Sequence, residues 1–94
     1  MTTEIKKLPL TFRKNDYDFV QLERDEKKAI YALSIEGSEV AFEVIKIRTR
    51  QERTNLFSGK LDPPSEIYPG NEEFGKTGWF ITDKDRAYRK YRSL

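Results

Sequence analysis

Apolar residues alternate with polar residues over most of the first fifty positions, which is the two-residue period of a half-buried β-strand. The alternation runs through four segments, at 8–12, 17–24, 29–36 and 40–47. A polar four-residue turn at 25–28 and the pair Gly37-Ser38, which fits a two-residue type II′ loop, separate the last three segments. The pattern therefore predicts an antiparallel meander, in which consecutive strands are joined by short turns.

The lengths of these turns also predict which residues face each other. The two-residue loop places Leu33 opposite Phe42 and Tyr31 opposite Val44, and the four-residue turn places Leu22 opposite Tyr31. Every apolar residue then meets another apolar residue across the sheet, which favours this register.

The apolar face changes within the fourth segment. Val40, Phe42 and Val44 occupy alternate positions, and Ile45 and Ile47 then take over the pattern. We expect one extra residue near Val44 or Ile45, a β-bulge, which would return the isoleucines to the core face. In the alternative interpretation, both faces of this strand are covered, one of them by a C-terminal helix.

Residues 83–94 follow the helical period instead. Thr82 and Asp83 have the spacing of a helix N-terminus, and basic residues near the end of the segment suit the helix dipole. Ala87, Tyr88, Tyr91 and Leu94 share one face. We expect an amphipathic helix that packs on the sheet by its tyrosines, with Tyr91, Leu33 and Phe42 almost inaccessible to water.

The predicted fold class is α+β: an antiparallel β-meander of four or five strands, a long ordered loop, and one C-terminal amphipathic helix packed on the sheet. The 94 residues form a single domain, 1–94. Segment 8–12 contains Pro9, which cannot donate to a strand ladder, and is placed at a sheet edge.

Composition narrows the function classes. The chain has no Cys and no His, so the usual transition-metal ligands and the usual pairs of nucleophile and base are missing. Charged residues make up 36% of the chain but the formal net charge is only +2, so no strong uniform field arises. There is no membrane-length apolar run and no h-region at the start. We expect no enzyme activity, no cofactor, no metal, no membrane partner and a cytoplasmic location.

Segment 51–78 is too rich in proline and glycine for a regular period. A loop of this length is functional, partly disordered, or hides a short strand. Its aromatic end, Tyr68 to Trp79, is predicted to be an ordered recognition surface, with Trp79 anchored in the core and Tyr68 and Phe74 at the rim. We also expect Phe57, Ile67, Tyr68 and Phe74 to pin the loop onto the sheet. The predicted partner-binding residues are Tyr68, Asn71, Glu72, Phe74 and Lys76.

Glu72 and Glu73 could form an acid and base pair in this loop. A solvated loop tip is the favoured interpretation, because adjacent surface carboxylates seldom have perturbed pKa values. Segment 70–78 also lacks the spacing of a phosphate-binding loop, and a strand follows it instead of a helix.

Nucleic-acid binding is the alternative function. It would use the basic face of strand 40–50 and helix 83–94, with exposed aromatics as stacking platforms. The residues concerned are Lys46, Arg48, Arg50, Arg53, Arg86, Arg89 and Lys90. The same residues are equally explained as solvated faces over a core that contains the tyrosines and Trp79.

The Tyr68-to-Trp79 stretch and the Ala-Tyr-x-x-Tyr helix after it resemble small uncharacterised proteins of bacterial phages and mobile elements. The resemblance covers the last third of the chain and implies no activity, cofactor or site. We interpret the protein as a small non-enzymatic protein-interaction or accessory module that uses the 51–78 loop. Its partner is expected to be another protein, and its oligomeric state stays open, since an edge strand could pair with a second copy.

Overall fold

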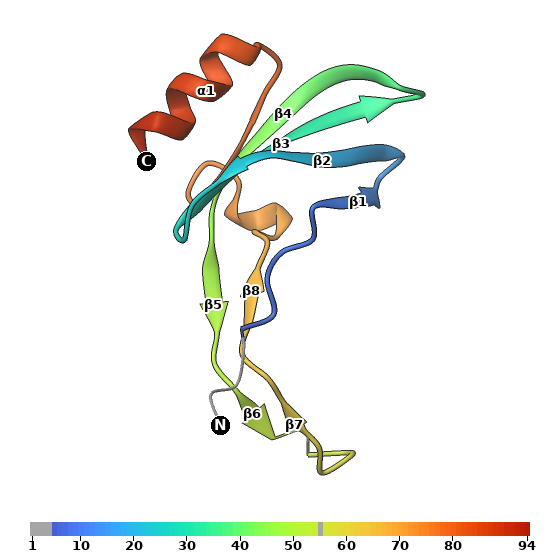
Figure 1. Ribbon diagram of the computed structural model, residues 1–94, viewed down its shortest axis with the longest axis vertical. Helices are drawn as coiled ribbons and strands as arrows, with labels where there is room; N and C mark the ends of the chain where they lie inside the picture. The colour runs from blue at the N-terminus through green and yellow to red at the C-terminus, as the bar shows by residue number, and fades with distance from the viewer. Residues whose placement is uncertain (1–4, 55) are drawn as a thin grey trace.

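The computed structural model describes residues 5–54 and 56–94, without the side chains at 53, 62 and 71. Five antiparallel strands form the main sheet in the order β1-β2-β3-β4-β9. Their bounds are β1 (Thr11–Lys14), β2 (Tyr17–Arg24), β3 (Lys28–Ile35), β4 (Ser38–Lys46) and β9 (Gly78–Ile81). Helix α1 (Lys84–Ser93) lies against one face of this sheet (Figure 1). The predicted α+β class, with its C-terminal helix on an antiparallel sheet, is confirmed.

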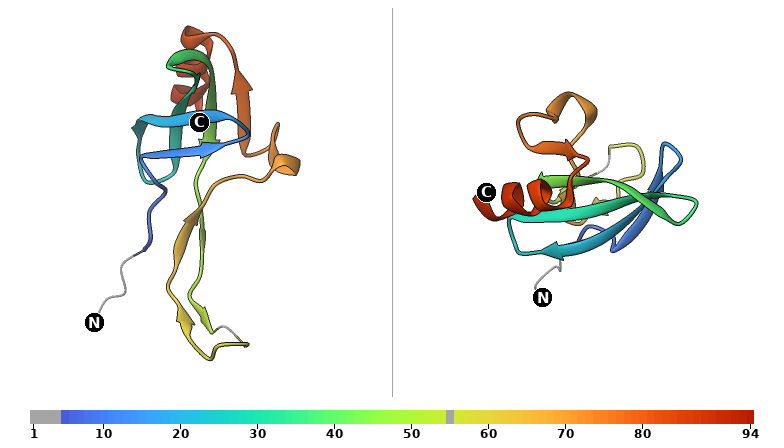
Figure 2. Two further views of the ribbon diagram at one scale, coloured as in Figure 1. Left: turned by 90° about the vertical axis from the view of Figure 1, so that its right-hand side faces the viewer. Right: turned by 90° about the horizontal axis from the view of Figure 1, so that it is seen from above.

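Segment 48–67 forms a ribbon that leaves the sheet, and we call it the arm. Strand β5 (Arg48–Arg50) pairs with β8 (Ser65–Ile67), and β6 (Arg53–Thr54) pairs with β7 (Leu61–Asp62). The arm extends away from the sheet and helix in two perpendicular views (Figures 1 and 2). Of the three interpretations of the 51–78 loop, the one with hidden strands is therefore confirmed.

The return from the arm to the sheet is short and hydrogen-bonded. A 3-10 turn, η1 (Asn71–Glu73), lies between β8 and β9. The backbone N–H of Glu73 donates to the carbonyl of Gly70 at 2.9 Å, and that of Gly75 donates to the carbonyl of Gly78 at 2.6 Å. The stretch between β8 and β9, residues 68–77, is thus a hydrogen-bonded return to the sheet.

Strand β3 is buried on both faces, because the sheet has a core on each side. On one side, which we call the arm face, Phe19, Tyr31, Leu33 and Ile45 pack beneath the N-terminal segment and Tyr68. On the other, the helix face, Ile30, Ala32, Phe42 and Val44 pack against Ala87 and Tyr91 of α1. The alternative interpretation, in which both faces of the strand 40–47 are covered, is confirmed. The expected β-bulge near Val44 or Ile45 is wrong, because β4 pairs with β3 without a shift between Ala41 and Lys46.

The predicted register of β3 and β4 is wrong by one residue. The turn is Glu36-Gly37 instead of Gly37-Ser38, and both residues have positive φ, 50° and 82°, as a type I′ turn requires. The register then shifts between Leu33 and Ser34, so that Leu33 faces Ala41 and Ala32 faces Phe42. Leu33 and Phe42 therefore lie on opposite faces of the sheet, although both are buried as expected, with 1% and 4% of their surfaces exposed.

A second irregularity interrupts β2. The four-residue turn is confirmed, because Arg24 faces Ala29 and the Asp25 carboxylate accepts the N–H groups of Lys27 and Lys28. The register then shifts at Leu22, so Tyr31 faces Gln21 and not Leu22. An N-terminal strand lies at the sheet edge as predicted, but β1 begins at Thr11 and not at Leu8, so Pro9 lies outside it.

Candidate functional site

The root of the arm is held by an ion pair with β2. The Glu66 carboxylate on β8 accepts hydrogen bonds from two nitrogens of Arg24, at 2.7 and 2.8 Å, and from the N–H of Leu8 at 2.9 Å. These charge-assisted bonds hold the pKa of Glu66 below its usual value. One carboxylate thus ties the N-terminal segment, the sheet and the arm together.

Tyr68, directly after β8, belongs to the core and not to a rim. Its ring centroid lies 5.4 Å from that of Phe12, 6.2 Å from that of Phe19 and 5.5 Å from that of Tyr31, in edge-to-face arrangements. Its hydroxyl donates to the Oε1 atom of Glu43 at 2.5 Å, and burial raises the pKa of Tyr68 well above the usual value. The prediction that Tyr68 lies at an exposed rim is therefore wrong, whereas the expectation that it pins the loop onto the sheet is confirmed.

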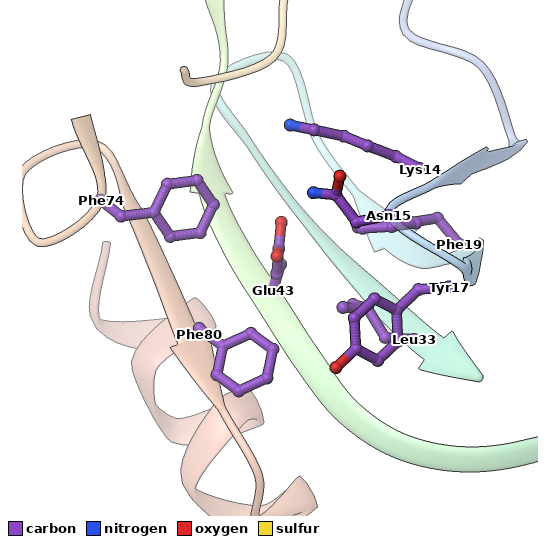
Figure 3. Close-up of a pocket in the computed structure, with 8 residues that line it drawn as sticks. All are labelled: Lys14, Asn15, Tyr17, Phe19, Leu33, Glu43, Phe74 and Phe80. Carbon is purple, nitrogen blue, oxygen red and sulfur yellow. The ribbon is translucent and has the colours of Figure 1, made fainter. Parts of the chain in front are cut away.

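The side chain of Glu43 on β4 lines a pocket of about 230 Å³ on the arm face. The pocket is lined by Lys14, Asn15, Tyr17, Phe19, Leu33, Glu43, Phe74 and Phe80. Figure 3 shows the Glu43 carboxylate between Phe74 and Phe80 on one side and Tyr17 on the other. Burial raises the pKa of Glu43, against the opposing effects of the Tyr68 hydroxyl and the Lys14 ammonium. We call this site the Glu43 pocket.

The sequence did not single out the Glu43 pocket. The predicted register put Phe42 on the same face as Tyr31 and Leu33, and Glu43 entered no prediction. The remaining walls come from the β1–β2 hairpin, β3, β9 and the residue after η1, which are far apart in sequence. The sequence feature that marks the pocket is an acidic residue, Glu43, that alternates with Ala41 and Ile45. It indicates a buried carboxylate only once these residues are known to face the core.

Trp79 is not the core anchor that we expected. It lies half-buried on the edge strand β9, where it faces Val44. The Nζ atom of Lys90 lies 4.1 Å from the Trp79 ring centroid, and that of Lys46 lies 6.0 Å from it. An edge strand has a neighbour on one side only, so its aromatic residue is covered by the long cationic side chains of the adjacent strand and helix.

The other predicted partner-binding residues do not form one surface. Glu72 and Lys76 are exposed, the side chain of Asn71 lies outside the described part of the chain, and Phe74 turns inward to the Glu43 pocket. Glu73 is ion-paired with Arg48 of β5, so Glu72 and Glu73 are not arranged as an acid and base pair.

The predicted nucleic-acid residues divide into two groups. Lys46 and Lys90 meet around Trp79, and Arg86, Arg89 and Lys90 line a shallow hollow on α1. Arg50 is exposed on the arm, Arg48 is paired with Glu73, and the side chain of Arg53 lies outside the description. The sequence missed Lys27 and Lys28, which join Lys46 and Arg48 around a second cavity of about 450 Å³, because it treated them only as turn residues.

The far end of the arm displays two large apolar side chains. Leu56 is 94% exposed and Phe57 is 102% exposed, and Leu61 beside them is also exposed. Figure 1 places this end of the arm at the opposite end of the molecule from α1. The expectation that Phe57 pins the loop onto the sheet is wrong. We call Leu56, Phe57 and Leu61 the arm tip.

Known proteins offer no guide to these sites: no family model, no curated protein and no solved structure matched the chain. In the described residues, no three His, Cys, Asp or Glu side chains are grouped as a metal ion would need. Across the same residues, no helix has the length and apolar character needed to cross a membrane.

Proposed function

We propose that this protein is a non-enzymatic binding module that docks onto another protein by its arm tip. One observation carries the proposal: Leu56 and Phe57 are adjacent, large and fully exposed at the end of a projecting ribbon. Burying such a side chain is worth roughly 1.5–3 kcal/mol, and the domain forgoes this gain at both positions. A partner surface would recover it.

The support of the arm tip is suited to presenting it. The β5–β8 and β6–β7 pairings carry the tip away from the sheet, and the Arg24–Glu66 pair fixes the root of the ribbon. Presenting apolar residues on a preorganised hairpin lowers the ordering cost of binding. The arm tip lies within the 51–78 segment that the sequence singled out, although at its opposite end from Tyr68.

The surroundings of the arm tip favour a protein over a membrane as the partner. Arg50, Glu52 and Lys60 are exposed on the arm and carry both signs of charge. An apolar centre with a mixed polar rim is the usual anatomy of a protein interface, whereas attraction to an anionic bilayer needs a cluster of one sign. We therefore propose that the partner offers an apolar groove with polar edges.

The test compares the wild-type protein with a Leu56→Ser/Phe57→Ser variant as bait in lysate of the encoding organism, with quantitative mass spectrometry. Leu10→Ser is the matched control, because Leu10 is 70% exposed but lies just before β1, where its carbonyl accepts the N–H of Gln21, and not in the arm tip. Both variants should unfold at the same urea concentration as the wild type. A protein retained by the wild type and by Leu10→Ser, and released by the tip variant, supports the proposal.

The retained protein is then purified and titrated by calorimetry. Because residues that anchor an interface cost at least about 2 kcal/mol each when truncated, the tip variant should bind at least about 30-fold more weakly. Sedimentation velocity tests whether the groove belongs to a second copy of this chain. Equal retention by the tip variant, or equal loss with Leu10→Ser, would refute the proposal.

Nucleic-acid binding stays as a second candidate, supported by the meeting of Lys46 and Lys90 at Trp79, next to Arg86 and Arg89 on α1. Fluorescence anisotropy with a labelled single strand tests it, since affinity for a phosphate backbone falls steeply between about 50 and 200 mM salt. Absence of binding at the lower salt rejects this candidate. A cytoplasmic location and an origin in phages or mobile elements stay predictions.

A further inference from the structure

The position of Glu43 in the sheet is unusual for a charged residue. On β4 it shares the arm face with Ala41 and Ile45, whose surfaces are 1% and 0% exposed, and packing alone would favour an apolar residue between them. A carboxylate in such a place costs stability unless its oxygens find partners. Tyr68 donates to one of the two oxygens.

The second oxygen of Glu43 is available to a ligand. Among the described residues it accepts no hydrogen bond, and no basic nitrogen lies within ion-pairing distance of it. Lys14 is exposed at the pocket rim and acts on Glu43 only through its charge. The carboxylate is thus built into the sheet with half of its bonding capacity directed to the pocket.

The aromatic walls of the pocket attract a cation, as the Glu43 carboxylate does. Tyr17 stands on one side of Glu43, and Phe74 and Phe80 stand on the other (Figure 3). Phe80 is paired with Glu43 across β4 and β9 and is 50% exposed, so it contributes to the wall without being required for the core. Aromatic rings present a negative face, and a cation among several of them is stabilised further when a carboxylate is beside it.

We propose that the Glu43 pocket binds an alkylammonium group of the size of a lysine side chain. Its volume of about 230 Å³ lies below the range of roughly 300–1,000 Å³ that holds drug-sized ligands, which excludes nucleotides and most organic cofactors. An anion would meet Glu43 and the aromatic faces, and a neutral apolar group would leave the carboxylate unpaired. An ammonium cation, primary or quaternary, pairs by charge with the ionised carboxylate and meets the ring faces, and a primary one also donates an N–H to the free oxygen.

Lys14 acts as an internal competitor in this arrangement. Its ammonium lies at the pocket rim, where it repels a second cation and partly neutralises Glu43. Replacing it by methionine keeps the aliphatic wall and removes the charge. Lys14→Met should therefore bind an alkylammonium ligand several-fold more tightly than the wild type does.

The test is a chemical-shift titration of the isotope-labelled protein with choline and, in parallel, with 3,3-dimethylbutan-1-ol, a neutral molecule of the same shape. Choline should shift the amide signals of Tyr17, Glu43, Phe74 and Phe80 with a dissociation constant on the order of millimolar, as expected for one cation among aromatic rings. The alcohol should shift them at least about tenfold more weakly. Equal affinity for the two molecules, or no shift with choline, overturns the proposal.

Two variants separate binding from folding. Glu43→Gln retains an acceptor for Tyr68 and loses the charge, so it should weaken choline binding at least about tenfold, because a desolvated ion pair is replaced by a neutral contact. Glu39→Gln removes an exposed carboxylate from the same strand and should change nothing. Phe80→Leu should weaken binding while leaving the rest of the spectrum in place. Unchanged affinity in Glu43→Gln also overturns the proposal.

A final pair of probes identifies the source of the ammonium group. Acetyl-Gly-Lys-Gly-amide is compared with n-butylammonium chloride and with the norleucine form of the peptide. Tighter binding of the lysine peptide than of the free amine supports a lysine presented by another protein, and the reverse order supports a free amine as ligand. Equal binding of the norleucine and lysine peptides would again refute recognition of the charge.

Discussion

Removing the charge of Glu66 should detach the root of the arm and destabilise the whole domain. Glu66 accepts three hydrogen bonds, two from Arg24 and one from the N–H of Leu8. Its side chain is 8% exposed, and that of Arg24 is 20% exposed. Glu66→Gln keeps the shape of the side chain, but its amide group can match only part of these donors and leaves the guanidinium of Arg24 unpaired.

The expected cost follows from the bonds that are lost. A hydrogen bond to a charged group contributes about 1.5–3 kcal/mol, and breaking a fully buried pair costs about 3–5 kcal/mol. This pair is largely but not fully buried, so a loss of roughly 2–4 kcal/mol at neutral pH is expected for Glu66→Gln. In urea unfolding, with a slope of about 1 kcal/mol per molar for a small domain, the midpoint should fall by roughly 2–4 M.

The pH dependence of this loss distinguishes the ion pair from a packing defect. The folded-state pKa of Glu66 lies below its ordinary value of 4.5, so the stabilisation is present above that value and disappears as pH falls through the folded-state pKa. The difference between the wild type and Glu66→Gln should therefore shrink steadily in acid. Arg24→Met should show the same trend. A loss below about 0.5 kcal/mol, or one that is constant with pH, would refute the reasoning.

Three further predictions rest on the same two-sided sheet. Tyr68→Ala should cost about 3–5 kcal/mol in urea unfolding, because it empties the aromatic cluster, and Trp79→Ala should cost less because Trp79 is only half-buried. Glu43→Gln should be more stable than the wild type at neutral pH and equal to it in acid, because a raised folded-state pKa means that the wild type loses stability as the carboxylate ionises. Amide exchange should be orders of magnitude faster in β6 and β7 than in β3, since these two strands have two residues each and none of their described side chains is buried.

The long strands of the main sheet and helix α1 could be predicted from the sequence because each has a clear period. Alternation over eight residues defines β2 and β3, and the cap and apolar face define α1, where Asp83 accepts the N–H of Arg86 as a cap should. The burial of Leu33, Phe42 and Tyr91 follows from their apolar character, whichever face they occupy.

The register could not be predicted because it depends on single-residue events. The turn uses Glu36 at positive φ, a conformation that few residues other than glycine adopt, and Val40 is the extra residue beyond it. A slip of one residue exchanges the two faces of a strand, so the predicted register put Phe42, and not Glu43, on the face of Tyr31 and Leu33. The error in register and the failure to find the pocket are the same error.

The arm escaped prediction for a different reason. Strands β6 and β7 have two residues each, which is shorter than any detectable period. Prolines at 63 and 64 suggested an extended path but gave no partner for it. Aromatic character alone suggested that Phe57 and Trp79 are buried, yet one lies at the arm tip and the other on an edge strand. Whether these aromatic side chains are buried depends on the residues that the fold places next to them.

The two proposed sites meet at one residue. Tyr68 follows β8 directly, so its ring secures the root of the arm in the aromatic cluster, while its hydroxyl holds Glu43 in the pocket. A cation in the pocket would pair with the same carboxylate and stabilise its ionised form. The ionised form is also the stronger acceptor for the Tyr68 hydroxyl. This hydrogen bond is one connection between the pocket and the arm; the continuation of β4 into β5 and the Arg48–Glu73 pair beside Phe74 are two others. Tyr68→Phe keeps the ring and removes the bond, so it separates the anchoring of the arm from the positioning of the carboxylate.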